Sequence, residues 1–166
     1  SYVEPLGIWF SVAVYSPRKE YFTAVFDNIT ERKRAAEALR ESEEQYRTVT
    51  ESVNDAIIVI DQNSRIILFA NNSVEKIFGY SVSELLGKEM TTLMPERYRD
   101  DHRAGVKRYV ETGVKHINWK STQVPGLHKS GKEIPLEISY GEYAKGAERY
   151  LVGVIRDVTK LRQAEE

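Results

Sequence analysis

The side chains that could perform chemistry in this chain are few and widely spaced. The 166 residues include three histidines and no cysteine, so disulfides, thiolate nucleophiles and cysteine-ligated metals are excluded. The sequence has no glycine-rich phosphate loop, nucleophile elbow or close metal-ligand spacing. His102 stands in a stretch with helical spacing, and His128 in a loop-like segment. We therefore expect an input or binding module and not an enzyme.

Composition narrows the class of protein further. The chain has 24 basic and 25 acidic residues, a net charge of −1 and no block of one sign. Neither nucleic-acid binding nor attachment to a membrane surface is therefore indicated. No apolar run is long enough to span a membrane. We expect a cytoplasmic protein or the cytoplasmic part of a membrane receptor. The length suits one ordinary domain with an additional segment.

The elements that must position these residues follow the order of an α+β domain. Two apolar runs, at 56–60 and 65–70, predict a hairpin. Two short helices follow, which Asn71-Asn72 and Ser81 are expected to cap. A longer helix and three strands complete the order, at about 98–111, 115–124, 133–142 and 149–157. This order predicts a five-stranded antiparallel sheet with helices on one face.

One phrase occurs twice, and each copy marks a change from strand to helix. The copies end in Asn28-Ile29-Thr30 and Asp157-Val158-Thr159. A helix that begins there has unsatisfied N–H groups in its first turn, and Asp157 or Thr159 can accept them. The first copy closes a predicted β-hairpin at residues 8–26. An isolated hairpin is marginal in water, so we expect this one to pack against another surface.

Residues 30–53 have helical spacing with a weak heptad seam. Charged residues fill the other faces of this helix. The pattern suits either a solvated single helix or a parallel coiled coil of two chains. In the second case the seam would include Ala35, Leu39, Tyr46 and Val49.

Several phrases within residues 43–160, in this order and spacing, resemble a PAS sensor domain. They are Asn54-Asp-Ala-Ile-Ile-Val-Ile-Asp61, Ala70-Asn-Asn with Phe78-Gly-Tyr-Ser81, Leu93-Met-Pro-Glu-Arg97, Lys129-Ser-Gly-Lys-Glu-Ile-Pro135 and Val154-Ile-Arg-Asp-Val-Thr159. The resemblance implies a PAS fold with a complete domain at 54–159. It also implies the C-terminal hairpin of a truncated upstream PAS domain at 1–30, a connector helix at 31–53 and the start of an output helix at 160–166.

In the family that these phrases resemble, the junction of the last strand with the outgoing helix transmits strain from the sheet. That implies a signalling role for Asp157 and Thr159, with Arg162 or Lys160 anchoring the carboxylate. The plainer alternative is a helix cap worth about 1 kcal/mol. In the first copy Asn28 replaces the acidic residue before Thr30 and cannot form an ion pair, so we expect the second junction to be better coupled.

The region around His102 also resembles the haem PAS domain of FixL-type oxygen-sensing histidine kinases. That resemblance implies a haem site, with His102 as the iron ligand, contacts to the haem propionates from Arg108, Tyr109 and His116, and further contacts from Ile138 and Tyr140. Thr122 stands where those kinases have a distal arginine, and the bulky residues Trp119 and Tyr140 can fill the cavity instead. An unfilled or aliphatic core and another small ligand are the alternatives. A flavin–cysteinyl adduct is excluded because cysteine is absent.

The resemblance implies a sensory or signal-relay module of a larger prokaryotic signalling protein, with a histidine kinase expected. Its partners would be a second copy in a parallel homodimer and a downstream kinase or other output domain. Two alternatives remain open, namely a ligand-free dimerisation or spacer module and a haem-based gas sensor that uses His102.

Overall fold

The computed structural model describes residues 1–165. They form two compact units, one at residues 1–49 and one that begins at Thr50. None of the helices in these 165 residues is long and apolar enough to cross a membrane.

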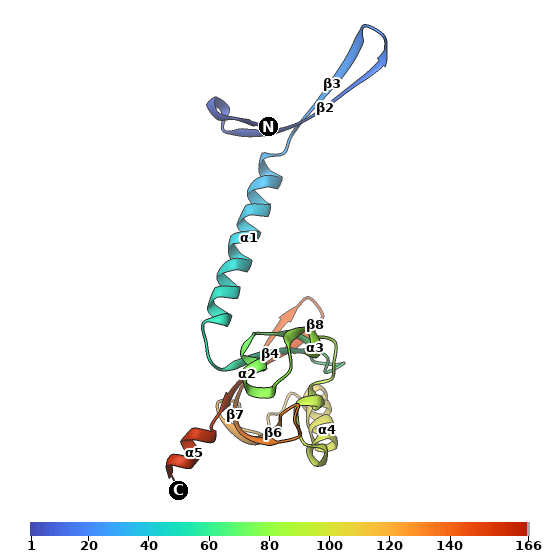
Figure 1. The fold of residues 1–166 in the computed structure, drawn as a ribbon. Coiled ribbons are helices and arrows are strands. Elements are labelled where there is room, and N and C mark those ends of the chain that lie inside the picture. The colour runs from blue at the N-terminus through green and yellow to red at the C-terminus, as the bar shows by residue number, and fades with distance from the viewer. Residues whose placement is uncertain (166) are drawn as a thin grey trace. The chain divides into compact units, whose positions relative to one another are not determined.

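The first unit is a small antiparallel sheet followed by a long helix (Figure 1). The predicted hairpin is present as β2 (Ile8–Arg18) and β3 (Tyr21–Asn28). A short strand that the sequence did not predict, β1 (Tyr2–Val3), pairs with β2 after the 3-10 turn η1 (Glu4–Leu6). Helix α1 (Thr30–Glu51) follows β3 and confirms the expected helix. Its sequence forms i,i+3 and i,i+4 ion pairs, in which Arg40 contacts Glu37 and Glu44.

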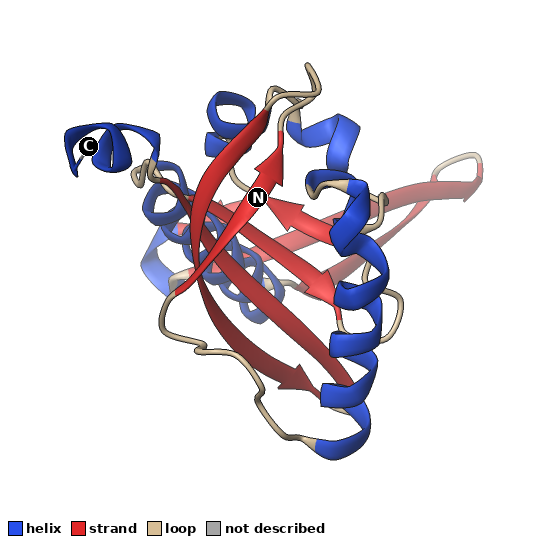
Figure 2. Cartoon of the chain, turned by 90° about the horizontal axis from the view of Figure 1, so that it is seen from below, coloured by secondary structure: helices blue, strands red, loops and turns tan. Residues whose placement is uncertain are grey.

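The second unit has the predicted order of strands and helices. Its elements are β4 (Ala56–Asp61), β5 (Ile67–Ala70), α2 (Ser73–Phe78), α3 (Val82–Leu85), η2 (Met90–Leu93), α4 (Glu96–Thr112), β6 (Thr122–Leu127), β7 (Glu133–Lys145), β8 (Glu148–Asp157) and α5 (Thr159–Glu165). The five strands lie in the order β5-β4-β8-β7-β6, and every pair is antiparallel. Figure 2 shows this twisted sheet with the helices beside it.

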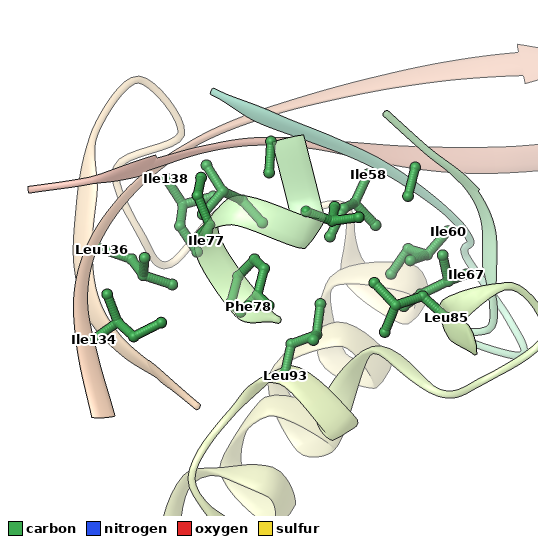
Figure 3. Close-up of a cluster of buried hydrophobic side chains, with 14 residues drawn as sticks. Ile58, Ile60, Ile67, Ile77, Phe78, Leu85, Leu93, Ile134, Leu136 and Ile138 are labelled. Carbon is green, nitrogen blue, oxygen red and sulfur yellow. The ribbon is translucent and has the colours of Figure 1, made fainter. Parts of the chain in front are cut away.

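Alternating apolar residues on the strands build the core of the second unit. Strand β4 buries Ala56, Ile58 and Ile60, because side chains two residues apart share one face of a strand. In Figure 3 Ile77 and Phe78 of α2 lie between the β7 residues and those of β4 and β5. Phe78 is fully buried. The core therefore lies between one face of the sheet and the short helices.

Two sequence predictions of local structure were wrong. Asn72 precedes α2, but neither it nor Asn71 forms the expected side-chain cap. Pro125 and Gly126 were expected to interrupt a strand at 115–124, whereas they lie inside β6, which begins at Thr122. Proline is tolerated there because β6 is an edge strand. The expected cap at Ser81 is confirmed, as Ser81 and Glu84 form a reciprocal capping box.

Candidate functional site

The last residue of β8 closes the turn into α5. The carboxylate oxygen Oδ1 of Asp157 accepts hydrogen bonds from the backbone N–H of Thr159 at 2.8 Å and from its hydroxyl at 2.5 Å. Between them, Val158 is buried and donates its N–H to the Pro135 carbonyl at 3.0 Å. One side chain thus satisfies the first N–H group of the helix and holds the strand and helix in a defined turn.

The first copy of the phrase has the same geometry. Oδ1 of Asn28 accepts from the Thr30 N–H at 3.1 Å and from its hydroxyl at 2.7 Å. Ile29 donates to the Trp9 carbonyl at 2.9 Å, as Val158 does to Pro135. The copies differ at one donor, because Trp9 N–H also donates to the Thr30 hydroxyl at 2.9 Å. Pro135 has no N–H, so Thr159 lacks that bond.

The expected anchoring of Asp157 by a basic residue of the helix is not what the structure shows. The guanidinium of Arg162 donates to the Gln123 side chain of β6 at 2.9 Å, and Lys160 is exposed. Helix α5 is therefore tied to the sheet at two places, through Asp157 at the end of β8 and through Gln123 on the edge strand.

The sequence did not predict the role of Asn71, which fixes the segment through which the chain enters the domain. Asn71 is fully buried, and its side chain accepts from the Ile57 N–H at 2.9 Å. Its amide donates to the carbonyls of Thr50 at 2.7 Å and Asp55 at 3.1 Å. A polar residue that directly follows a half-buried strand was the available signal, since a buried amide must find partners. Asn71 thereby connects the last turn of α1 with the start of β4.

The two residues after Asn71 strengthen the same connection. The Asn72 N–H donates to the carboxylate of Glu51 at 2.9 Å, and the Ser73 hydroxyl donates to the Val53 carbonyl at 2.9 Å. The start of α2 is thus hydrogen-bonded to the end of α1 and to the residues that follow it.

The chain enters the five-stranded sheet at β4 and leaves it at β8, and these two strands are neighbours. Ala56, the first residue of β4, lies opposite Ile155 of β8. Beside this pair, the guanidinium of Arg156 donates to both carboxylate oxygens of Asp55, at 3.1 and 2.9 Å. This hydrogen-bonded ion pair raises the pKa of Arg156. Since Arg156 directly precedes Asp157, the ion pair joins the segment after α1 to the strand end that launches α5.

His102 lies on α4, partly buried beside a cluster of charges. Arg103 pairs with Glu89 at 2.9 Å, and Arg65 approaches the same carboxylate at 3.5 Å. Burial lowers the pKa of His102 and the charge of Arg65 lowers it further, while Glu89 acts in the opposite direction. Its Nδ1 is buried and accepts or donates no hydrogen bond among the described residues. The neutral imidazole is therefore the favoured form.

The other residues that the haem resemblance named are divided between the surface and the core. Arg108 and His116 are exposed. The Tyr109 hydroxyl donates to the Glu142 carboxylate, where the resemblance would place a contact to a propionate. Its ring lies 5.0 Å from that of Trp119, which lies 6.1 Å from that of Tyr140.

These rings and their neighbours argue against haem. Tyr140 packs against the hydrophobic core, to which Ile138 belongs. A haem would have to displace the Tyr140 and Trp119 rings and bring a propionate near the negative charge of Glu142. The described residues therefore do not fit haem.

A five-stranded antiparallel sheet with short helices on one face, entered and left by helices, defines a class of small α+β domains. The PAS fold family matches residues 44–158. The chain belongs to the PAS family, as the sequence predicted.

Relatives with curated names support a sensor role. The chain is 34% identical over 145 residues to the sensor protein FixL of Bradyrhizobium diazoefficiens, a match that covers 87% of this chain and 28% of FixL. It is 28% identical over 133 residues to the cell-division control histidine kinase PdhS of Brucella anthropi, which covers 78% of this chain and 12% of PdhS. The chain thus spans under a third of the length of either relative.

Solved structures confirm the fold. The crystal structure of a PAS domain from Colwellia psychrerythraea superposes with a TM-score of 0.59 at 24% identity, covering 70% of this chain and 97% of that domain. Residues 44–158 are thus a PAS domain similar to the sensor domains of histidine kinases.

Proposed function

We propose that this chain relays a conformational signal within a larger signalling protein, with a histidine kinase as the expected output. Helix α1, the connector, would deliver the signal to the sheet. Helix α5, the start of the output helix, would carry it to a downstream domain. The observation that carries this proposal is the Asp55–Arg156 ion pair, which joins the entry of the domain to its exit at 2.9 Å.

The geometry gives a physical route for the relay. A displacement of the last turn of α1 acts on Asn71, because Asn71 bonds the Thr50 carbonyl. The same side chain bonds the Asp55 carbonyl, and the Asp55 carboxylate holds Arg156. A shift of Arg156 moves the next residue, Asp157, and with it both hydrogen bonds to Thr159. Side chains and backbone groups that are linked by successive hydrogen bonds can change together between two arrangements.

Two kinds of input fit this route. One is a change that arrives through α1 from an upstream domain, and the other is a small ligand in the core of the PAS domain. We favour the first, because the hydrogen bonds of Asn71 and of the Asn72 N–H reach α1 directly.

A ligand-free dimerisation module is the second candidate, and one observation favours it. The seam residues of α1 are exposed, with Leu39 at 60%, Tyr46 at 72% and Val49 at 64%, and Ala35 exposed beside them. A stripe of apolar side chains at heptad spacing suits a parallel coiled coil of two chains. We propose a parallel homodimer in either case, since the relay through α1 does not exclude it.

The relay is tested at the exit junction in the longer signalling protein. Asp157→Ala removes the acceptor for both Thr159 bonds and should uncouple the output from its input, while the fold of the domain persists. Asp157→Asn is the matched control, because Asn28 shows that an amide oxygen makes the same two bonds. Normal output from Asp157→Ala would contradict the proposal. Loss of output from both variants would mean that the charge matters and not the bond.

A further inference from the structure

The small sheet of the first unit repeats the last three strands of the PAS domain. Its order is β1-β2-β3, and the PAS sheet ends in β8-β7-β6. Phe10 lies opposite Asn28 as Leu136 lies opposite Asp157, and both pairs stand immediately before the junction. The correspondence is therefore one of register as well as of sequence.

The match extends along all three strands. Val12 pairs with Phe26 at the positions where Ile138 pairs with Ile155. On the other edge, Tyr2 pairs with Trp9 where Pro125 pairs with Pro135. Strand β1 thus occupies the place of β6, although it is much shorter.

The two sheets differ in how far the corresponding apolar residues are buried. Ile138 and Ile155 are 7% and 1% exposed and belong to the core cluster that also includes residues of α2 and β4. At the corresponding positions, Val12 and Phe26 are 46% and 67% exposed. These apolar residues occupy core positions of a PAS sheet with nothing over them in the part of the chain that the structure describes.

The edge of β3 gives a second and independent sign. In the PAS domain, the corresponding edge of β8 pairs with β4 from Ala56–Ile155 to Asp61–Tyr150. In the described residues β3 pairs with β2 alone and is an edge strand of eight residues. Such an edge, long and apolar, is a template for another strand.

We propose that the surface formed by Val12, Phe26 and the free edge of β3 binds a segment of this protein that precedes Ser1. That segment would add a strand antiparallel to β3 in the register of β4, and helices over Val12 and Phe26, so completing a second PAS domain. Its length would match that of residues 56–121. A second copy of this chain is disfavoured, since its own β1-β2-β3 sheet brings no covering helices. The proposal does not rest on the relay function.

Hydrogen exchange tests the proposal. The exchange of β3 amides is measured in residues 1–166 and in a chain extended upstream by the residues that its gene encodes before Ser1. We expect the β3 amides that do not bond β2 to exchange at least about tenfold more slowly in the extended chain. Phe26→Asp in the extended chain should restore fast exchange. Tyr15→Asp, an exposed aromatic on the opposite face of the hairpin, should leave exchange slow.

Two results would overturn the proposal. One is equal exchange of β3 in both chains, or a gene with no upstream segment of the required length. The other is slow exchange in residues 1–166 that depends on concentration and is lost in Phe26→Asp, which would assign the surface to a second copy. Exchange in residues 50–165 serves as the internal control for folding of each variant.

Discussion

Asp55 and Arg156 lie 101 positions apart in the sequence and form a two-point hydrogen-bonded ion pair at the place where the chain enters and leaves the PAS sheet. The guanidinium of Arg156 is largely exposed, and a pair of this kind adds at most about 1 kcal/mol to the free energy of unfolding. Its value lies in geometry, because a planar guanidinium held by both carboxylate oxygens has a fixed orientation.

The buried amide of Asn71 should matter for stability as well as for the relay. Asn71→Ala leaves the Ile57 N–H and the carbonyls of Thr50 and Asp55 without this partner. We expect a loss of about 3 kcal/mol in the free energy of unfolding, measured with urea. In the control Asn72→Ala, whose bond to Glu51 uses the backbone, we expect a change below about 0.5 kcal/mol. Equal effects of the two substitutions would contradict the assigned role.

Pro135 should weaken the exit junction relative to the first copy. Pro135→Ala supplies an N–H where Trp9 has one, and the new donor can bond the Thr159 hydroxyl as Trp9 bonds Thr30. We expect slower amide exchange in α5, by up to about tenfold for one hydrogen bond. Pro125→Ala on the facing strand is the matched control and should leave α5 unchanged. Unchanged exchange in Pro135→Ala would show that the missing donor has no effect.

His102 predicts a pH dependence of stability. Because its pKa is lowered on folding, mainly by burial, the unfolded chain binds a proton that the folded chain resists. The free energy of unfolding should therefore fall as the pH drops below about 6.5, the value for a free histidine. His102→Gln should reduce that slope between pH 7 and 5, and His116→Gln on the exposed loop should not. The charged groups that act on His102 are Arg65, Glu89 and Arg103. The same slope in both variants would contradict this account.

The seam of α1 predicts the oligomeric state. Leu39→Asp combined with Tyr46→Asp places charges on the stripe and should yield monomers in sedimentation, if the seam joins two helices. Ala38→Asp, beside the seam on the same helix, is the control. A wild-type chain that is monomeric at all concentrations would remove the dimerisation candidate.

Local patterns in the sequence were sufficient for most of the elements and for the junction residues. The two phrases predicted Asn28, Thr30, Asp157 and Thr159 as turn residues. This was possible because each acceptor side chain lies only two residues before the N–H group that it binds. The partner of Arg162 and the Asp55–Arg156 pair could not be predicted in this way. Each depends on the register of strands that are distant in the sequence.

Predictions for the core and for the edge strands of the sheet were limited in the same way, because they depend on strand order. The two apolar runs correctly predicted the β4–β5 hairpin, but the sequence predicts a break at Pro125 and Gly126 because it does not show that β6 is an edge strand. Gly126 is buried, and a Cβ atom there would clash with the Leu136 side chain. Strand β1 has only two residues, so its sequence could not show that it is the counterpart of β6. That correspondence became visible only from the register of the strands.

The central claim is that entry and exit are coupled through Asp55 and Arg156, and charge reversal tests it most directly. The measurement is amide exchange of Thr159 and the rest of α5 in Asp55→Arg, Arg156→Asp, the double variant and the exposed control Asp101→Arg. Each single reversal should raise exchange in α5 by about tenfold, and the double variant should return it to near the wild-type rate. Wild-type exchange in both single variants, or no recovery in the double variant, would contradict the coupling.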